Sequence, residues 1–118
     1  MGHTTTRLAD HKGFTRPRVQ GDEYVIDVSV NIATYTTGGI VIPASELGLS
    51  KITSAYIIRI GGGLATHSIN LVGGADTTNN LYLEVNVEDG TTGIEAELAN
   101  ANASLDGNPI IIRARGLI

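Results

Sequence analysis

The chain has 118 residues, of which 42% are hydrophobic, 17% charged and 4% aromatic, and this composition fits a single domain with a core of modest size. It contains no Cys, which excludes disulfides, thiolate nucleophiles, Cys-ligated zinc and iron–sulfur clusters. The formal net charge of −4 is unevenly distributed: residues 1–18 carry four basic side chains and one acidic one, so the remaining residues carry a net −7.

Residues 1–22 are polar and follow no apolar periodicity, and they contain Gly13, Pro17 and Gly21. Such a stretch cannot build a core of its own. We therefore expect an extended basic N-terminal arm over residues 1–22 and a single β-sandwich domain over residues 23–118. The side chains of the arm that we expect to contact a partner are Arg7, Lys12, Phe14, Arg16 and Arg18.

The first part of the domain alternates apolar and polar residues. Residues 24–32 follow the period of a half-buried strand. A turn is expected at residues 35–39 and a short strand at 40–42. Residues 43–48 predict one helical turn, which Gly48 closes in the left-handed conformation.

The middle of the chain predicts three longer strands. Residues 52–60 are apolar on both faces, which is typical of a central strand. After a break at residues 61–63, strands are expected at 64–72 and 81–88, separated by a polar loop at 73–80.

The last part of the chain alternates again. Apolar residues alternate with Glu over 94–98, a turn is expected at 106–109, and a terminal strand at 110–115 carries Arg113 and Arg115 on its polar face. Six to eight short strands joined by Gly-rich turns predict an all-β protein. The architecture is either a β-sandwich of jelly-roll type or a small barrel.

Residues suited to catalysis or metal binding are few. His3, His11 and His67 match no metal-binding spacing, and the adjacent His67 and Ser68 point to opposite faces of a strand, so they do not form a base and nucleophile pair. We expect no catalytic residue, no metal and no cofactor. Four carboxylates are expected on a solvated acidic face: Glu84, Glu88, Glu95 and Glu97.

Membrane and nucleic acid are not expected partners. No apolar run approaches the roughly 20 residues that span a bilayer, and residues 1–6 lack the apolar segment of a secretory signal. The four cations of the arm suit only weak, salt-sensitive phosphate binding, and the acidic remainder of the chain repels phosphates. We expect a soluble chain that is synthesised in a cytoplasm.

Two segments resemble a known group of proteins. Residues 35–39, Tyr-Thr-Thr-Gly-Gly, precede residues 44–49, Ala-Ser-Glu-Leu-Gly-Leu, and an isoleucine-led strand at Ile52. This pattern is similar to one in small tailed-bacteriophage proteins encoded near the major capsid protein, and residues 110–116 resemble the way such chains end. The resemblance covers residues 24–60 and 110–118, and the basic arm departs from the shorter leaders of the pattern.

The resemblance implies a non-enzymatic virion structural protein of the capsid decoration or cement type. Such a protein binds the outer surface of the major capsid protein lattice and stabilises it. A dimer or trimer is expected, because virion components follow the local symmetry of their lattice. Two alternatives stay open: a head-to-tail neck, tail or fibre component, and a β-sandwich module that binds a carbohydrate or another host-surface ligand.

Overall fold

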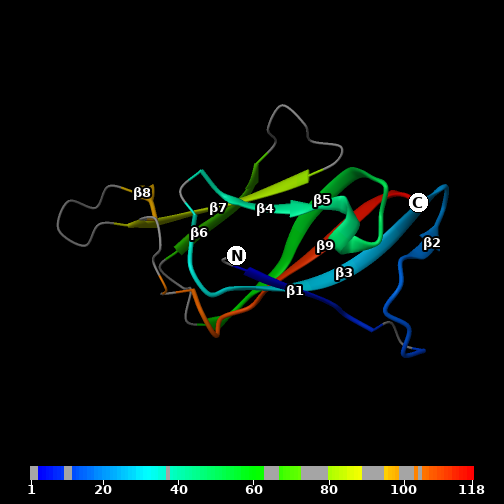
Figure 1. Ribbon diagram of the computed structural model, residues 1–118, viewed down its shortest axis with the longest axis horizontal. Helices are drawn as coiled ribbons and strands as arrows, with labels where there is room; N and C mark the ends of the chain where they lie inside the picture. Colours follow the sequence, from blue (N-terminus) through cyan, green and yellow to red (C-terminus); the bar gives the residue numbers. More distant parts are fainter. Residues whose placement is uncertain are drawn as a thin grey trace.

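The computed structural model describes residues 3–9, 12–36, 38–62, 67–72, 80–88, 95–98, 103 and 105–118. Within these residues the chain is all-β, and two antiparallel sheets pack together in a sandwich-like fold (Figure 1). The predicted fold class is therefore confirmed, and of the two architectures left open the sandwich is the one observed.

The larger sheet has five strands in the order β1-β3-β9-β5, and β2 also pairs with β3. β1 and β2 lie end to end along the same edge of β3, because β1 pairs with residues 28–32 and β2 with residues 23–25. The strands are β1 (His3–Arg7), β2 (Arg18–Gln20), β3 (Glu23–Ile32), β5 (Lys51–Ile60) and β9 (Ile110–Leu117).

The smaller sheet has four strands in the order β4-β7-β6, and β8 also pairs with β7. As in the larger sheet, two short strands, β4 and β8, share one edge of a long one. Its strands are β4 (Ile40–Pro43), β6 (His67–Val72), β7 (Asn80–Glu88) and β8 (Glu95–Glu97).

The core lies between the two sheets and follows from their alternation. β3 buries every second residue from Ile26 to Ile32, and β9 does the same from Ile110 to Ala114. The facing strands supply the other wall. The buried cluster on the strands is Ile26, Val28, Val30, Ile32, Ile40, Ile42, Ile52, Leu81, Leu83, Val85, Ile110, Ile112 and Ala114.

The predicted helical turn is confirmed as a 3₁₀ helix, η1 (Ala44–Leu47), which Gly48 closes at φ 77°. The Gly48 N–H donates to the Ser45 carbonyl, and the Leu49 N–H donates to the Ala44 carbonyl. Leu47 and Leu49 are both buried, so the turn covers one edge of the core, as the sequence predicts.

β5 lies at the end of the larger sheet, so the prediction of a central strand is wrong. It pairs only with β9 among the described strands and ends the larger sheet. The pairing shifts register between Ile52 and Ser54 and again between Ile57 and Arg59, so one continuous alternation does not hold. Tyr56, which the alternation placed on one face with Ile52, is 49% exposed.

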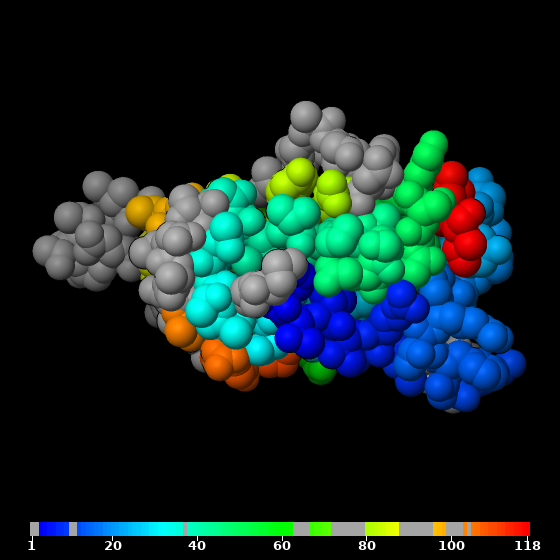
Figure 2. Space-filling view, in the orientation of Figure 1, coloured from blue at the N-terminus to red at the C-terminus, as the bar shows by residue number. Residues whose placement is uncertain are grey.

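The N-terminal segment contributes strands to the larger sheet. β1 and β2 both pair with β3, and the Leu8 N–H donates to the Asp27 carbonyl in the gap between them. Figure 2 shows residues 3–9 against residues 44–50, and residues 12–20 at the end of the molecule where β9 also ends. The chain's own body therefore orders this segment wherever the structure describes it.

Some predicted segments lie outside the described residues. These are the first part of the strand at 64–72, most of the loop at 73–80, and residue 94. The imidazole of His11 and the side chains of Glu88 and Glu95 also lie outside them.

Candidate functional site: a basic and apolar groove

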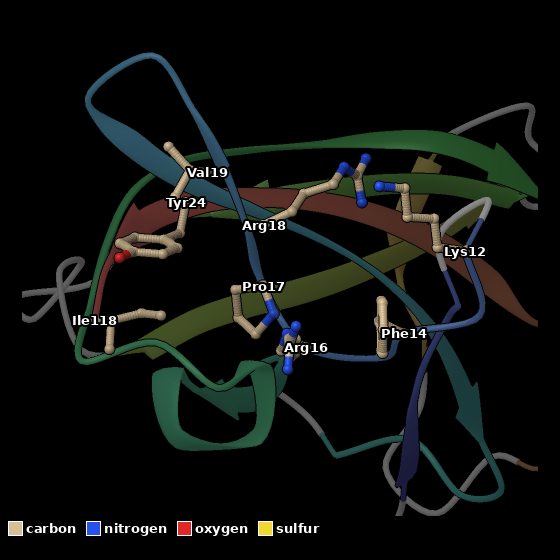
Figure 3. A pocket seen from close by; sticks show the side chains of 8 residues that line it. All are labelled: Lys12, Phe14, Arg16, Pro17, Arg18, Val19, Tyr24 and Ile118. Atoms are coloured by element: carbon tan, nitrogen blue, oxygen red, sulfur yellow. The ribbon is translucent and has the colours of Figure 1, made fainter.

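A groove of about 470 Å³ opens where the segment before β2 crosses the end of the larger sheet (Figure 3). It contains four of the five side chains that the sequence predicts for partner contact. Its lining residues are Lys12, Phe14, Arg16, Pro17, Arg18, Val19, Tyr24 and Ile118.

The local sequence explains how the groove forms. Gly21 and Asp22 form a two-residue turn between β2 and β3, since Gln20 pairs with Glu23, and Gly21 adopts φ 68°. This hairpin brings Val19 opposite Tyr24. The chain before it therefore folds back beside the C-terminal end of β9.

Arg16 lies over the ring of Phe14, with its guanidinium carbon 4.5 Å from the ring centre. Phe14 is 48% exposed, so the stack lies at the surface. Such an exposed cation–π contact is worth about 0.5–1 kcal/mol, enough to favour one orientation of both side chains. One face of the only Phe in the chain is thus occupied by a cation.

Arg18 lies at the edge of an ion-pair network on the outer face of the larger sheet. Its Nη2 is 3.9 Å from the Asp27 carboxylate, which Arg113 holds in a bidentate pair at 2.7 and 2.9 Å. The Arg113 hydrogen bonds lower the pKa of Asp27, against the effect of its partial burial. Arg113 makes the short contacts with this carboxylate, and the Arg18 guanidinium forms a longer ion pair with it.

Arg7 does not reach the groove. Its Nε donates to the Glu46 carbonyl at 3.1 Å and its Nη2 to the Ser45 carbonyl at 3.3 Å. His3, on the same face of β1, places Nε2 3.2 Å from the Glu46 carboxylate. Both side chains therefore attach β1 to η1, and the partner contact that we expected of the exposed Arg7 stays a prediction.

The apolar half of the groove was not predicted from the sequence: Pro17, Val19, Tyr24 and Ile118. One signal was available, because a Gly-Asp pair between two short extended segments predicts a two-residue hairpin. That hairpin pairs Val19 with Tyr24. No local pattern indicates that Ile118 meets this hairpin, since their contact depends on β9 lying beside β3.

Glu97 is partly exposed and also makes specific hydrogen bonds. Its carboxylate accepts hydrogen bonds from the Tyr35 hydroxyl at 2.6 Å and from the Gly38 N–H at 2.7 Å, and these bonds lower the pKa of Glu97. Glu97 thus ties Tyr35 and Gly38 to β8.

The described residues bring together no group of three or more His, Asp or Glu side chains that would suit a metal ion. His67 lies on β6 opposite Val87, and neighbouring Ser68 alternates to the other face of the strand. In the same part of the chain, no helix is long and apolar enough to cross a membrane. The groove is the feature of the described surface that carries the most recognition chemistry.

Comparison with protein-family models, curated proteins and solved structures gives no match to this chain.

Proposed function

We propose that this chain is a non-enzymatic structural protein of a tailed-phage virion. In this proposal it is a capsid decoration or cement protein that binds the outer surface of the major capsid protein lattice and stabilises it. The observation that carries the proposal is the groove, where three cations and several exposed apolar side chains of the described residues meet at one end of the sandwich. The resemblance of residues 24–60 and 110–118 to phage head-region proteins supports the same assignment.

The groove fits contact with a protein surface. Val19 and Ile118 are each 66% exposed, and such side chains bury apolar area when a partner covers them. Lys12 and Arg16 add positive charge beside them, although the chain as a whole is acidic. A surface with both features suits an acidic neighbour that also offers apolar contacts.

A cement protein gains its effect from repetition. Many copies on a symmetric lattice add small contacts, so that no single copy needs a tight site. Point substitutions in the groove are the appropriate probes, because deleting the N-terminal segment would remove two strands of the larger sheet, β1 and β2.

We include a homo-oligomer in the proposal and assign β5 as the contact between copies. β5 offers ten residues of strand at the end of the larger sheet, and Tyr56, Ile58 and Ile60 are exposed along it. Exposed edge strands of this kind pair with other strands. A two-fold pairing of β5 with a second copy would give a dimer.

The experiment that tests the proposal is the copy number of the chain relative to the major capsid subunit in purified particles, measured by quantitative mass spectrometry. A ratio comparable to that of the capsid subunit is the expected result. A handful of copies would instead indicate a neck, tail or fibre component. Complete absence would reject a virion role and favour the carbohydrate or host-surface module, which a ligand-dependent rise in melting temperature would detect.

A further inference from the structure

We propose that the groove binds an extended, acidic peptide segment that inserts one apolar side chain between Pro17, Tyr24 and Ile118. The inference rests on the proposed function in one respect, namely that the segment belongs to a capsid subunit. The groove chemistry itself can be tested without a capsid.

The apolar side chain is assigned to one end of the groove. In Figure 3, Tyr24, Pro17 and Ile118 lie around this end, with Val19 beside Tyr24. Tyr24 and Pro17 are half-buried, so they form the floor, whereas Val19 and Ile118 are exposed and form the walls. A floor and walls of this kind accept a branched or aromatic side chain of modest size.

The acidic groups are assigned to the other end. Lys12 and Arg18 lie there in Figure 3, and Arg16 is held on Phe14 nearby. Among the described residues, the lining has three cationic side chains and no Asp or Glu side chain, and the nearest carboxylate paired with it in an ion pair is that of Asp27, 3.9 Å from the Arg18 Nη2. Carboxylates that approach this end therefore meet a positive local potential, although the chain carries a net −4.

A nucleic acid fits the groove less well than a peptide. Single strands bind by stacking bases on exposed aromatic faces. Arg16 covers one face of Phe14, and Tyr24 is half-buried under the hairpin. Residues 19–118 carry the acidic balance of the chain and would repel a phosphate backbone that extends beyond the groove.

The test is a titration of the full chain, labelled with ¹⁵N, with short synthetic peptides followed by NMR. The first peptide carries several Glu residues around one Leu, the second has the Leu replaced by Ser, and the third has each Glu replaced by Gln. We expect the first peptide to shift the amide signals of residues 12–24 and 116–118, and the other two to bind at least about fivefold more weakly.

Variants of the chain separate the groove from general charge effects. Arg16→Glu is expected to weaken binding of the first peptide by about tenfold, and by more at low salt, because the charge at this position then repels the peptide's carboxylates. Ser68→Glu, at an exposed position of β6 outside the groove and away from β5, is the control for added negative charge and should leave binding within about twofold. Val19→Ser should remove most of the difference in affinity between the Leu and Ser peptides.

The inference is overturned if the first peptide produces no shifts, if the three peptides bind equally, or if a single-stranded oligonucleotide of equal charge binds more tightly. These outcomes are distinct from failure of the proposed function. A capsid-level copy number without peptide binding would mean that another surface contacts the lattice. Peptide binding by a chain absent from particles would keep the groove and reject the virion role.

Discussion

Tyr35 links the residues of the Tyr-Thr-Thr-Gly-Gly turn to the smaller sheet. Its ring is 1% exposed, its hydroxyl donates to Glu97, and the same hydroxyl accepts from the Val85 N–H at 3.2 Å. Val85 lies on β7 between the residues that pair with β4 and those that pair with β8. At this position no residue of β4 or β8 pairs with Val85, and the Tyr35 hydroxyl accepts the hydrogen bond from its N–H instead.

Tyr35→Phe should lower the free energy of unfolding by about 2 kcal/mol, because it leaves a buried N–H without its acceptor and removes a hydrogen bond to a carboxylate. Urea denaturation measures the change. Tyr82→Phe, a half-buried tyrosine of β7, is the matched control and should change stability by less than about 0.5 kcal/mol. Equal losses in the two variants would show that the hydroxyl of Tyr35 has no special role.

Alkaline pH provides a second measurement on Tyr35. Burial, followed by the hydrogen bond to Glu97, raises the pKa of Tyr35 to about 12. The raised pKa contributes stability that is present below the ordinary pKa of about 10 and is lost as pH rises through about 12. The stability difference between wild type and Tyr35→Phe should therefore shrink above pH 10, and a difference that stayed constant would contradict this account.

Asp27 predicts the opposite pH dependence. Its pKa lies below the ordinary value of 3.8, chiefly because of the Arg113 hydrogen bonds, so its contribution is present above that value and is lost as pH falls through the lowered pKa. Asp27→Asn should cost about 1–2 kcal/mol at neutral pH. Urea denaturation should find that this cost diminishes below about pH 4. A cost that is independent of pH would assign the effect to packing instead.

At the scale of elements, β9 depends on Gly116 for its approach to β5. A Cβ at this position would overlap the carbonyl oxygen of Lys51, so the two backbones are too close for any side chain. Gly116 lies opposite Tyr24 on one side and Ile52 on the other. The conformation of β9 beside β5 thus gives a steric reason for a glycine at this position.

Gly116→Ala should therefore destabilise the chain by more than about 2 kcal/mol, because backbone atoms of β5 must move. Gly62→Ala is the matched control, since a Cβ there meets nothing within 4 Å. Thermal denaturation followed by circular dichroism compares the two. A melting temperature of Gly116→Ala equal to that of the control would mean that β5 adjusts without cost.

The sequence predicted most elements and missed those that depend on tertiary pairing. β3, β4, β7 and β9 have strong local alternation, and their bounds agree with the predictions to within two residues. β1 is a run of polar residues that is a strand because β3 offers it an edge, so its alternation carries no apolar signal. The sequence also did not predict the bulges of β5, because register shifts arise from the pairing with β9.

At the scale of the whole molecule, the sequence likewise predicts one part of the candidate site and not the other. Phe14 was selected as the aromatic side chain of the segment, and charge counting selected Lys12, Arg16 and Arg18, since a basic segment on an acidic chain is visible in composition. Charge counting also selected Arg7, whose side chain is directed toward η1 by the pairing of β1 with β3. The apolar end was not predictable from composition, because it requires the β2–β3 hairpin and the end of β9 to meet in space.

The pairing proposed for β5 makes the last prediction. In an antiparallel pairing of two copies centred on Tyr56, Arg59 would lie opposite Thr53 and Lys51 opposite Gly61, so no like charges face each other. Sedimentation equilibrium should find a dimer of the full chain. Ile58→Lys should convert it to a monomer without loss of folding, because the side chain is 45% exposed.

Val41→Lys tests whether that effect is specific to the edge. Val41 is 42% exposed on β4 of the smaller sheet, so the variant introduces the same charge at a similar exposure away from β5. It should remain a dimer. If both variants dissociate, general apolar association holds the copies together rather than strand pairing. If the wild-type chain is a monomer at the protein concentrations at which it would bind a capsid, β5 is not the contact between copies. The symmetry of any assembly must then come from the capsid lattice.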